Sequence, residues 1–397
     1  MPTMLTAVLL IPLSLLALSG QQVDISAWTE RAALLSAMVN LPEGSIELLK
    51  DRFAGQLDED YYKGEEQDVG PYVEPWQDQE NPDLPNTVPE PVSSASEPQS
   101  EAPKQRPPVT EPPPAAQTGE EIPEEHRGRI LQENMAGTAN NLIAYGQGKL
   151  RNYTNVPDSE VQEIMEQGMN IHLEDTEEPQ VLIFHTHATE AYEPYDSENY
   201  DMRNSWRSTD HTKNMIAVGD VLEKELQAAG IGVVHDKTLH DYPSYNGAYE
   251  RSAETIKSYL EKYPSIKIAL DVHRDAIQRE EDLIVKPTVE IEGKKAAQLM
   301  IITGSEDGTM GVPNWRENLR FAASIQDAIE QDYPHLTRPI FFCYRKYNMD
   351  LTNGSLLFEV GSQANTLEES IYTAQLVGKS LAKLLQDNRS SGEEVQN

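Results

Sequence analysis

The stretch that decides the fold reads Val181-Leu-Ile-Phe-His-Thr-His-Ala-Thr-Glu-Ala-Tyr192. Its first four residues are apolar, a run short enough for a buried strand and too short for a helix. The run stops at His185, His187 and Glu190, and in open α/β sheets ligands bind beyond the carboxyl ends of the strands. We interpret His187 as the first ligand of a zinc site. The alternative is a pair of surface histidines at a strand end.

Strands and helices alternate along the region that follows, as the period of the apolar residues indicates. Apolar runs predict strands at residues 181–184, 231–234, 266–272, 340–344 and 355–360, with a hairpin within residues 288–303. Helical spacing predicts helices at residues 210–229, 248–263, 313–332 and 367–385. Short links between alternating strands and helices are typical of a largely parallel, covered sheet. The expected fold class is therefore α/β, with a mostly parallel central sheet flanked by helices.

The composition of the chain also predicts how it divides into segments. Residues 1–20 are apolar and uncharged, like a signal peptide or a membrane anchor, so we expect the rest of the chain to lie outside the cytoplasm, at the cell membrane. Proline, glutamate, serine and glutamine dominate residues 59–125, which predicts a disordered acidic linker. The other expected segments are a small helical juxtamembrane region (24–58), an N-terminal extension with helices at 134–145 and 159–169 (126–178), the catalytic domain (179–388) and a tail (389–397).

Charge and cysteine content exclude several classes of function. Lys and Arg number 32 against 66 Asp and Glu, a net charge of −34, so the chain should not bind nucleic acid through a general basic surface. Cys343 is the single cysteine, which rules out an intramolecular disulfide and a zinc site of several cysteines. Histidine and carboxylate are left as metal ligands.

Polar residues gather at three places in or after predicted strands. These are the stretch from His185 to Glu190, the run Asp271-Val-His-Arg-Asp275, and Glu359, which has apolar neighbours on both sides. A carboxylate in such surroundings is costly to bury unless it is paired or used. Catalytic zinc takes three protein ligands and leaves one position for water, whose pKa falls to about 7. Histidines and a buried glutamate that moves protons would supply such a site.

These residues carry a resemblance to a known family. His185-Thr-His-Ala-Thr-Glu-Ala-Tyr192, Asp271-Val-His-Arg-Asp-Ala276 and Phe358-Glu-Val-Gly-Ser362 resemble the stage II sporulation protein P family of endospore-forming bacteria. That family is similar to the zinc-dependent N-acetylmuramoyl-L-alanine amidases of the cell wall. The resemblance covers residues 130–385 and extends to the layout of anchor, acidic linker and catalytic domain. It implies an amidase-like fold and Zn²⁺ as the cofactor.

The resemblance also implies roles for single residues. It places zinc ligands at His187 and His273 and the catalytic glutamate at Glu359. The second ligand of the amidases is a glutamate at the start of the first helix, where this chain has His211, and we expect His211 to take its role. Glu190 is the alternative, as a ligand or to position substrate, because His187-x-x-Glu190 with a distant histidine is typical of zinc carboxypeptidases.

Three further residues are expected to support the zinc ligands through hydrogen bonds. They are His185, Arg274 and Asp275. Alternation along a strand would place His185 on the same face as His187. Arg251 matches an arginine on the second helix of the amidases, and its plain interpretation is a charge on a helix surface.

The function implied by the resemblance is hydrolysis of peptidoglycan, at the amide between the lactyl group of muramic acid and L-alanine of the stem peptide. The family also implies an endopeptidase activity, work in cell-wall remodelling during engulfment of the forespore, and stage II sporulation proteins D and M as partners. Two alternatives stay open: a zinc carboxypeptidase-like enzyme that uses Glu190, and a non-catalytic wall-binding scaffold. Metal content separates the two enzymes, and digestion of sacculi tests the scaffold.

Overall fold

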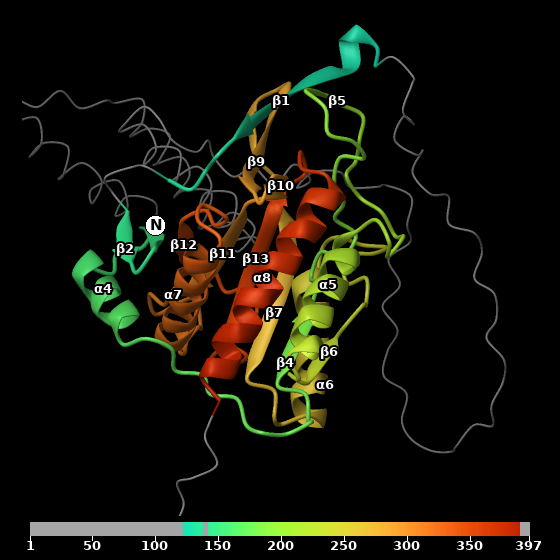
Figure 1. Cartoon of the computed structure of the whole chain (residues 1–397). Coiled ribbons are helices and arrows are strands. Elements are labelled where there is room, and N and C mark those ends of the chain that lie inside the picture. The colour runs from blue at the N-terminus through green and yellow to red at the C-terminus, as the bar shows by residue number, and fades with distance from the viewer. Residues whose placement is uncertain (1–121, 138–141, 390–397) are drawn as a thin grey trace, which may run out of the picture. The chain divides into compact units, whose positions relative to one another are not determined.

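The computed structural model describes residues 122–137 and 142–389, which contain an eight-stranded sheet (Figure 1). The strand order is β2-β3-β12-β11-β13-β7-β4-β6. Its centre is formed by β4 (Val181–Phe184), β7 (Ile268–Asp275) and β13 (Ser355–Ser362), which are neighbours and run parallel. The outer strands are β6 (Val233–His235), β11 (Leu299–Gly304), β12 (Ile340–Cys343), β3 (Gly148–Asn152) and β2 (Ile143–Tyr145). The carboxyl ends of the three central strands therefore meet at one edge of the sheet.

A second, five-stranded sheet lies beside the end of β13. It has the order β10-β9-β1-β5, with β8 paired to β9. The strands are β1 (Arg127–Glu133), β5 (Asn199–Asp201), β8 (Gln278–Glu280), β9 (Leu283–Ile291) and β10 (Lys294–Ala297). The turn between β9 and β10 has positive φ at both Glu292 (50°) and Gly293 (77°), as a tight hairpin requires. The hydroxyl of Ser362 donates a 2.6 Å hydrogen bond to the carbonyl of Val285 and so connects β13 to this sheet.

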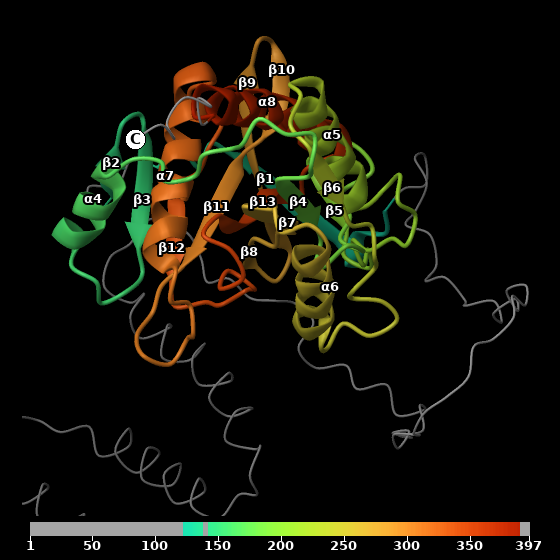
Figure 2. The same cartoon turned by 90° about the horizontal axis from the view of Figure 1, so that it is seen from below.

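Helices cover both faces of the eight-stranded sheet (Figure 2). One face carries α5 (Met215–Ala228), α7 (Trp315–Asp332) and α8 (Leu367–Asp387), and the other carries α6 (Ala248–Lys262). The remaining α-helix, α4 (Asp158–Glu166), packs against α7. Side chains cap two of these helices: Asn214 accepts from the backbone of α5, and Thr366 forms a capping box with Glu369 at the start of α8.

The apolar run of β4 is buried on both of its faces. Val181 and Ile183 belong to the core on the side of α5 and α8, while Leu182 and Phe184 pack with Ile256 of α6. None of the four strand residues is more than 3% exposed. A strand covered on both faces has no polar alternation, which is why its sequence is continuously apolar.

The structure corrects several sequence-based expectations. The eight-stranded sheet is mostly parallel, as expected, but it is mixed, because β11 runs antiparallel to β13 and β2 antiparallel to β3. The helix expected at 134–145 is wrong, since Ile143–Tyr145 forms β2. The strand expected at 266–272 continues through its polar residues to Asp275, and the helix expected from residue 210 begins at Met215.

Other expectations concern residues that the structure does not describe. The export segment (1–20), the juxtamembrane helices (24–58), and almost all of the linker (59–125) and the tail (389–397) lie outside the described residues. Within the described ranges, no helix combines the length and the apolar character needed to cross a membrane.

Candidate functional site

A turn directly after β4 carries His187 into the interior. The backbone N–H and the hydroxyl of Thr186 donate to Asp271 at 2.8 and 2.6 Å, and the hydroxyl of Thr189 donates to Asp241 at 2.5 Å. His187 itself is 5% exposed, and its ring stacks on that of Tyr245 with centroids 4.4 Å apart. The turn therefore fixes the imidazole through its neighbours on both sides.

His273 and Glu359 reach the same place from adjacent strands. They are direct partners in the parallel register of β7 and β13, so their side chains lie on the same face of the sheet. The ring of His273 is 5.2 Å from that of His187, centroid to centroid, and nearly perpendicular to it. Both His273 and Glu359 are buried. The structure thus brings together three residues that are distant in the sequence.

Glu190 is the carboxylate that faces Nδ1 of His273. Its Oε2 lies 3.7 Å from Nδ1 of His273 and accepts the backbone N–H of Arg274 at 3.2 Å. Guanidinium nitrogens of Arg274 and Arg207 lie 4.0 and 3.9 Å from its Oε1. A backbone amide and two cations therefore hold this buried side chain toward His273.

Negative charge predominates around His273. Its Nε2 lies 2.7 Å from Oδ1 of Asp271, as an ion-pair contact that is not aligned for a hydrogen bond. Burial alone would lower the pKa of His273, but Asp271, Glu190 and Glu359 outweigh it and raise the pKa to about 10. Burial, with the charge of Asp275, raises the pKa of Glu359 well above its usual range. A bound cation would offset this excess of negative charge.

The same cluster contains buried atoms that have no hydrogen-bond partner among the described residues. They are both ring nitrogens of His187, Nε2 of His273 and Oε2 of Glu359. Burial, with the positive charges of His273 and Arg207, lowers the pKa of His187 well below its usual value, so the ring is neutral and has a free lone pair. Buried polar atoms without partners are rare in proteins, and neutral imidazole and carboxylate are zinc ligands. The residues present fit a metal ion.

The structure does not bring His211 to this cluster. His211 lies in the exposed turn before α5, and its charge acts on the pKa of His235. The reason is the late start of the helix, which is capped by the buried Asn214 and leaves the three residues before it at the surface. Among the described residues His211 is exposed, whereas Oε2 of Glu190 lies 3.7 Å from Nδ1 of His273, which favours Glu190 over His211 as the second ligand.

His185 also lies elsewhere than expected. Its ring contacts the carbonyl of Val272 at 2.7 Å and Nε2 of His235 at 2.8 Å, whereas His187 faces the tyrosines Tyr245 and Tyr249. Strand alternation fails as a guide here because β4 ends at residue 184 and the chain then turns. His185 supports the backbone next to His273 rather than the ring of His187.

Arg274 and Asp275 both contact the surroundings of the cluster. Arg274 is 5% exposed, lies beside Glu190 and donates to the carbonyl of Trp206. Asp275 accepts a 2.7 Å hydrogen bond from Arg338, and its charge acts on Glu359. Both are buried parts of the charge network.

Two tyrosines that contact the ring of His187, Tyr245 and Tyr249, were not predicted from the sequence. Tyr245 stacks on His187, the edge of Tyr249 contacts the same ring, and the guanidinium of Arg207 lies 5.0 Å from the centre of the Tyr245 ring. Arg251 holds the segment that carries Tyr245 (residues 240–247, the Tyr245 loop), donating to three of its backbone carbonyls at 2.6–3.0 Å. The available signal was the run Tyr242-Pro-Ser-Tyr-Asn-Gly247, two aromatic residues directly before a helix.

The fold and the site together define a mixed α/β protein with a buried histidine–carboxylate cluster at the carboxyl ends of its central strands. Such a donor set suits a zinc ion. The sequence matches the family Stage II sporulation protein P (SpoIIP) over residues 84–382, and the chain belongs to that family.

Comparisons with single proteins give one relative in sequence and several solved structures. Stage II sporulation protein P of Bacillus subtilis (strain 168) is 30% identical over 233 residues, which are 54% of this chain and 54% of that one, so the chain spans about half the length of this relative. N-acetylmuramoyl-L-alanine amidase AmiC2 of Nostoc punctiforme has a TM-score of 0.31 at 10% identity, over 52% of this chain and 96% of that one. The CwlD amidase from Clostridioides difficile, in complex with the GerS lipoprotein, has a TM-score of 0.33 at 10% identity, over 52% and 99%.

Proposed function

We propose that this chain is a zinc-dependent peptidoglycan hydrolase of sporulation. Its substrate bond is the amide between the lactyl group of muramic acid and L-alanine of the stem peptide. The observation that carries the proposal is the buried ring of His187, next to His273 and two buried carboxylates, because neither of its nitrogens has a hydrogen-bond partner in the described part of the chain. Membership of a sporulation protein family supports the biological setting.

The zinc ion would be held by His187, Glu190 and His273. When bound, it polarises the scissile carbonyl and lowers the pKa of a water molecule to about 7. Asp271 contacts Nε2 of His273, and the backbone N–H of Arg274 donates to Glu190, so each of these two residues is oriented by a neighbouring polar group.

Glu359 is the group that moves the proton. Its carboxyl stands beside His273 in the strand register, and its Oε2 has no other partner among the described residues. Burial raises its pKa, which favours the protonated form after it has taken a proton from water. It then gives this proton to the leaving amine, as a general base that becomes a general acid. Such a group contributes about 10²–10⁴-fold to the rate.

The other parts of the chain belong to the same proposal. Residues 1–20 would anchor it in the cell membrane with the catalytic domain (179–388) on the extracytoplasmic side, and the linker (59–125) would give that domain reach. We further infer, from the family, endopeptidase action on stem peptides and assembly with stage II sporulation proteins D and M during engulfment. Peptidoglycan is the expected macromolecular partner.

Metal content tests the ligand set. We expect Glu190→Gln to lose zinc and His211→Gln to keep it, because Glu190 contacts His273 and His211 is exposed. Each variant changes a single side chain in a turn, so each is a control for the effect of a substitution in a turn on zinc content. Zinc lost from the His211 variant alone would restore His211 as the ligand.

The bond that is cleaved tests the function. Mass spectrometry of digested sacculi should show free stem peptides that begin with L-alanine for the wild type. Glu359→Gln should keep its zinc and lose activity by at least about 100-fold. Glu368→Gln, an exposed glutamate on α8, is the matched control. Wild-type digests without new amine ends would favour the scaffold and end the hydrolase proposal.

One observation keeps a second candidate open. A ligand pair His187-x-x-Glu190 with a distant His273 is what the carboxypeptidase-like alternative predicts, and it is supported by the 3.7 Å contact between Oε2 of Glu190 and Nδ1 of His273. Products separate the two enzymes, because a carboxypeptidase shortens stem peptides from the carboxyl end and leaves the lactyl amide intact.

A further inference from the structure

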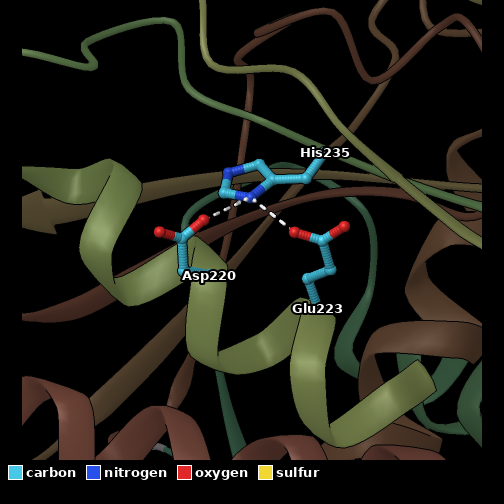
Figure 3. Close-up of side chains that lie close together, drawn as sticks. All are labelled: Asp220, Glu223 and His235. Carbon is cyan, nitrogen blue, oxygen red and sulfur yellow. Dashed lines mark hydrogen bonds and ion pairs between the residues drawn. The ribbon is translucent and has the colours of Figure 1, made fainter. Parts of the chain in front are cut away.

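A second group of metal-ligating side chains lies between α5 and β6, apart from the His187 cluster (Figure 3). Nδ1 of His235 is 3.2 Å from Oδ1 of Asp220 and 3.2 Å from Oε2 of Glu223. The two carboxylates are one turn apart on α5, and His235 is the last residue of β6. The side chain of His235 is 1% exposed and that of Asp220 is 47% exposed, so the group is buried on one side and open to solvent on the other.

The hydrogen bonds behind His235 determine which ring nitrogens carry hydrogen. A carbonyl only accepts, so Nδ1 of His185, 2.7 Å from the carbonyl of Val272, carries a hydrogen. The Nε2 of a neutral His185 must then accept, and Nε2 of His235, 2.8 Å away, must donate to it. A neutral His235 has one ring hydrogen, which leaves a lone pair on Nδ1. In this neutral form the lone pair faces two carboxylates, so three acceptor atoms converge; the 3.2 Å contact of Nδ1 with Oε2 of Glu223 is a hydrogen bond only when the ring carries a second hydrogen.

The helix beneath makes room for this pair of rings. A Cβ on Gly219 of α5 would lie 2.6 Å from Nε2 of His235 and 2.7 Å from Nε2 of His185. Any side chain at this position would clash with both imidazoles. The glycine directly before Asp220 therefore lets the two rings lie against α5 in contact with each other.

A cation fits between these three atoms. Two ligand atoms bound about 2.0–2.1 Å from a tetrahedral zinc ion lie about 3.3 Å apart, close to the 3.2 Å observed on each side of His235. Burial, with the charge of Lys237, lowers the pKa of His235 to about 3, which disfavours a proton in this place. The ammonium of Lys237 lies 2.6 Å from Asp220 and 4.0 Å from Glu223, so it neutralises chiefly one carboxylate.

We propose that Asp220, Glu223 and His235 bind a divalent transition-metal ion, separately from the His187 site. One imidazole and two carboxylates suit zinc or a similar ion, whereas calcium prefers oxygen ligands alone. The ion connects α5 to β6, which is the edge strand of its sheet, and His185 links this place to the backbone of β7 one residue before His273. The inference does not depend on the proposed hydrolase activity.

The test counts zinc on the full chain, with zinc alone as the probe. Wild type, His187→Ala and the double variant Asp220→Asn, Glu223→Gln are dialysed against buffered zinc, and the bound metal is measured by mass spectrometry. We expect two equivalents of zinc in the wild type. His187→Ala should keep the equivalent bound by Asp220, Glu223 and His235, and the double variant should lose it, with at least about 100-fold weaker binding at this site. Both carboxylates are partly exposed, so these near-isosteric changes should leave the fold intact.

Two further variants sharpen the result. Lys237→Met removes the competing ammonium, so zinc should bind this site more tightly. Separately, zinc bound at this site should raise the melting temperature of His187→Ala. His172→Gln, at an exposed histidine elsewhere, is the control for adventitious binding. A double variant with the zinc content and melting temperature of the wild type would overturn the inference, as would an imidazolium signal from His235 in ¹⁵N NMR at saturating zinc. Loss of one equivalent of zinc in His187→Ala, with the other kept, concerns the proposed hydrolase site and leaves this inference standing.

Discussion

Replacing Glu193 with glutamine is expected to change how the stability of the protein depends on pH. Glu193 is 7% exposed, and its Oε1 accepts hydrogen bonds from Nε1 of Trp206 (2.5 Å) and Nδ2 of Asn204 (3.2 Å). Burial raises the pKa of this carboxyl to about 7, although both hydrogen bonds act in the opposite direction. Between the ordinary value of 4.5 and about 7, the folded state therefore binds more protons here than the unfolded state, and stability falls as the pH rises.

The size of the expected change in unfolding free energy follows from the shift in the pKa of Glu193. Moving a pKa from 4.5 to about 7, at about 1.4 kcal/mol per unit, corresponds to about 3 kcal/mol. This contribution is fully present below pH 4.5 and is lost as the pH passes about 7. Glutamine keeps the acceptor oxygen and carries no charge. Glu193→Gln should therefore resemble the wild type near pH 4.5 and exceed its stability by up to about 3 kcal/mol at pH 8.

Urea unfolding, followed by tryptophan fluorescence at several pH values, measures this difference. Glu198→Gln, at an exposed glutamate nearby, is the matched control and should follow the wild type throughout. Parallel pH profiles for wild type and Glu193→Gln would refute the reasoning. The result also bears on the site, because Glu193 holds Trp206 at a positive φ of 46° and the next residue, Arg207, lies beside Glu190.

Two further predictions concern residues that hold the site or the core. Arg251→Met removes three hydrogen bonds from the Tyr245 loop, so we expect kcat/KM on peptidoglycan fragments to fall about 10- to 100-fold with zinc content unchanged; normal kinetics would show that the loop needs no such anchor. Lys286→Met leaves the buried carboxylate of Glu369, 2.8 Å away, without its cation and should cost about 3–5 kcal/mol in urea unfolding. Lys295→Met, at a more exposed lysine, should cost much less, and equal costs would contradict the argument.

The central strands could be predicted because burial on both faces leaves its mark in the sequence. The apolar run at 181–184 coincides with β4, and the run at 355–360 lies within β13. The strands of the second sheet carry no such mark. β1 is Arg-Gly-Arg-Ile-Leu-Gln-Glu, mostly exposed along its length, and its pairing with β9 joins residues that are far apart in the sequence. Its identity as a strand depends on that distant partner, which local periodicity cannot reveal.

The candidate site was predictable to a similar extent, for a similar reason. His187, His273 and Glu359 were found through motifs attached to buried strands, and the structure brings them together. The choice between His211 and Glu190 depended on where α5 begins and how the chain turns after β4. Both are set by side-chain hydrogen bonds, such as the cap at residue 214, that no period in the sequence expresses.

The mixed topology does not disturb the cluster, because the cluster uses only the parallel part of the sheet. The strand register pairs Phe184 with Asp271 and His273 with Glu359. The sheet therefore fixes the positions of His273 and Glu359 relative to the end of β4. The antiparallel strand β11 pairs with the opposite side of β13. Glu190 lies outside the named strands and is placed by Arg274, by the turn after β4 and by an isolated bridge with Arg207. Changes in turns should therefore displace this ligand first and leave His273 and Glu359 where the sheet puts them.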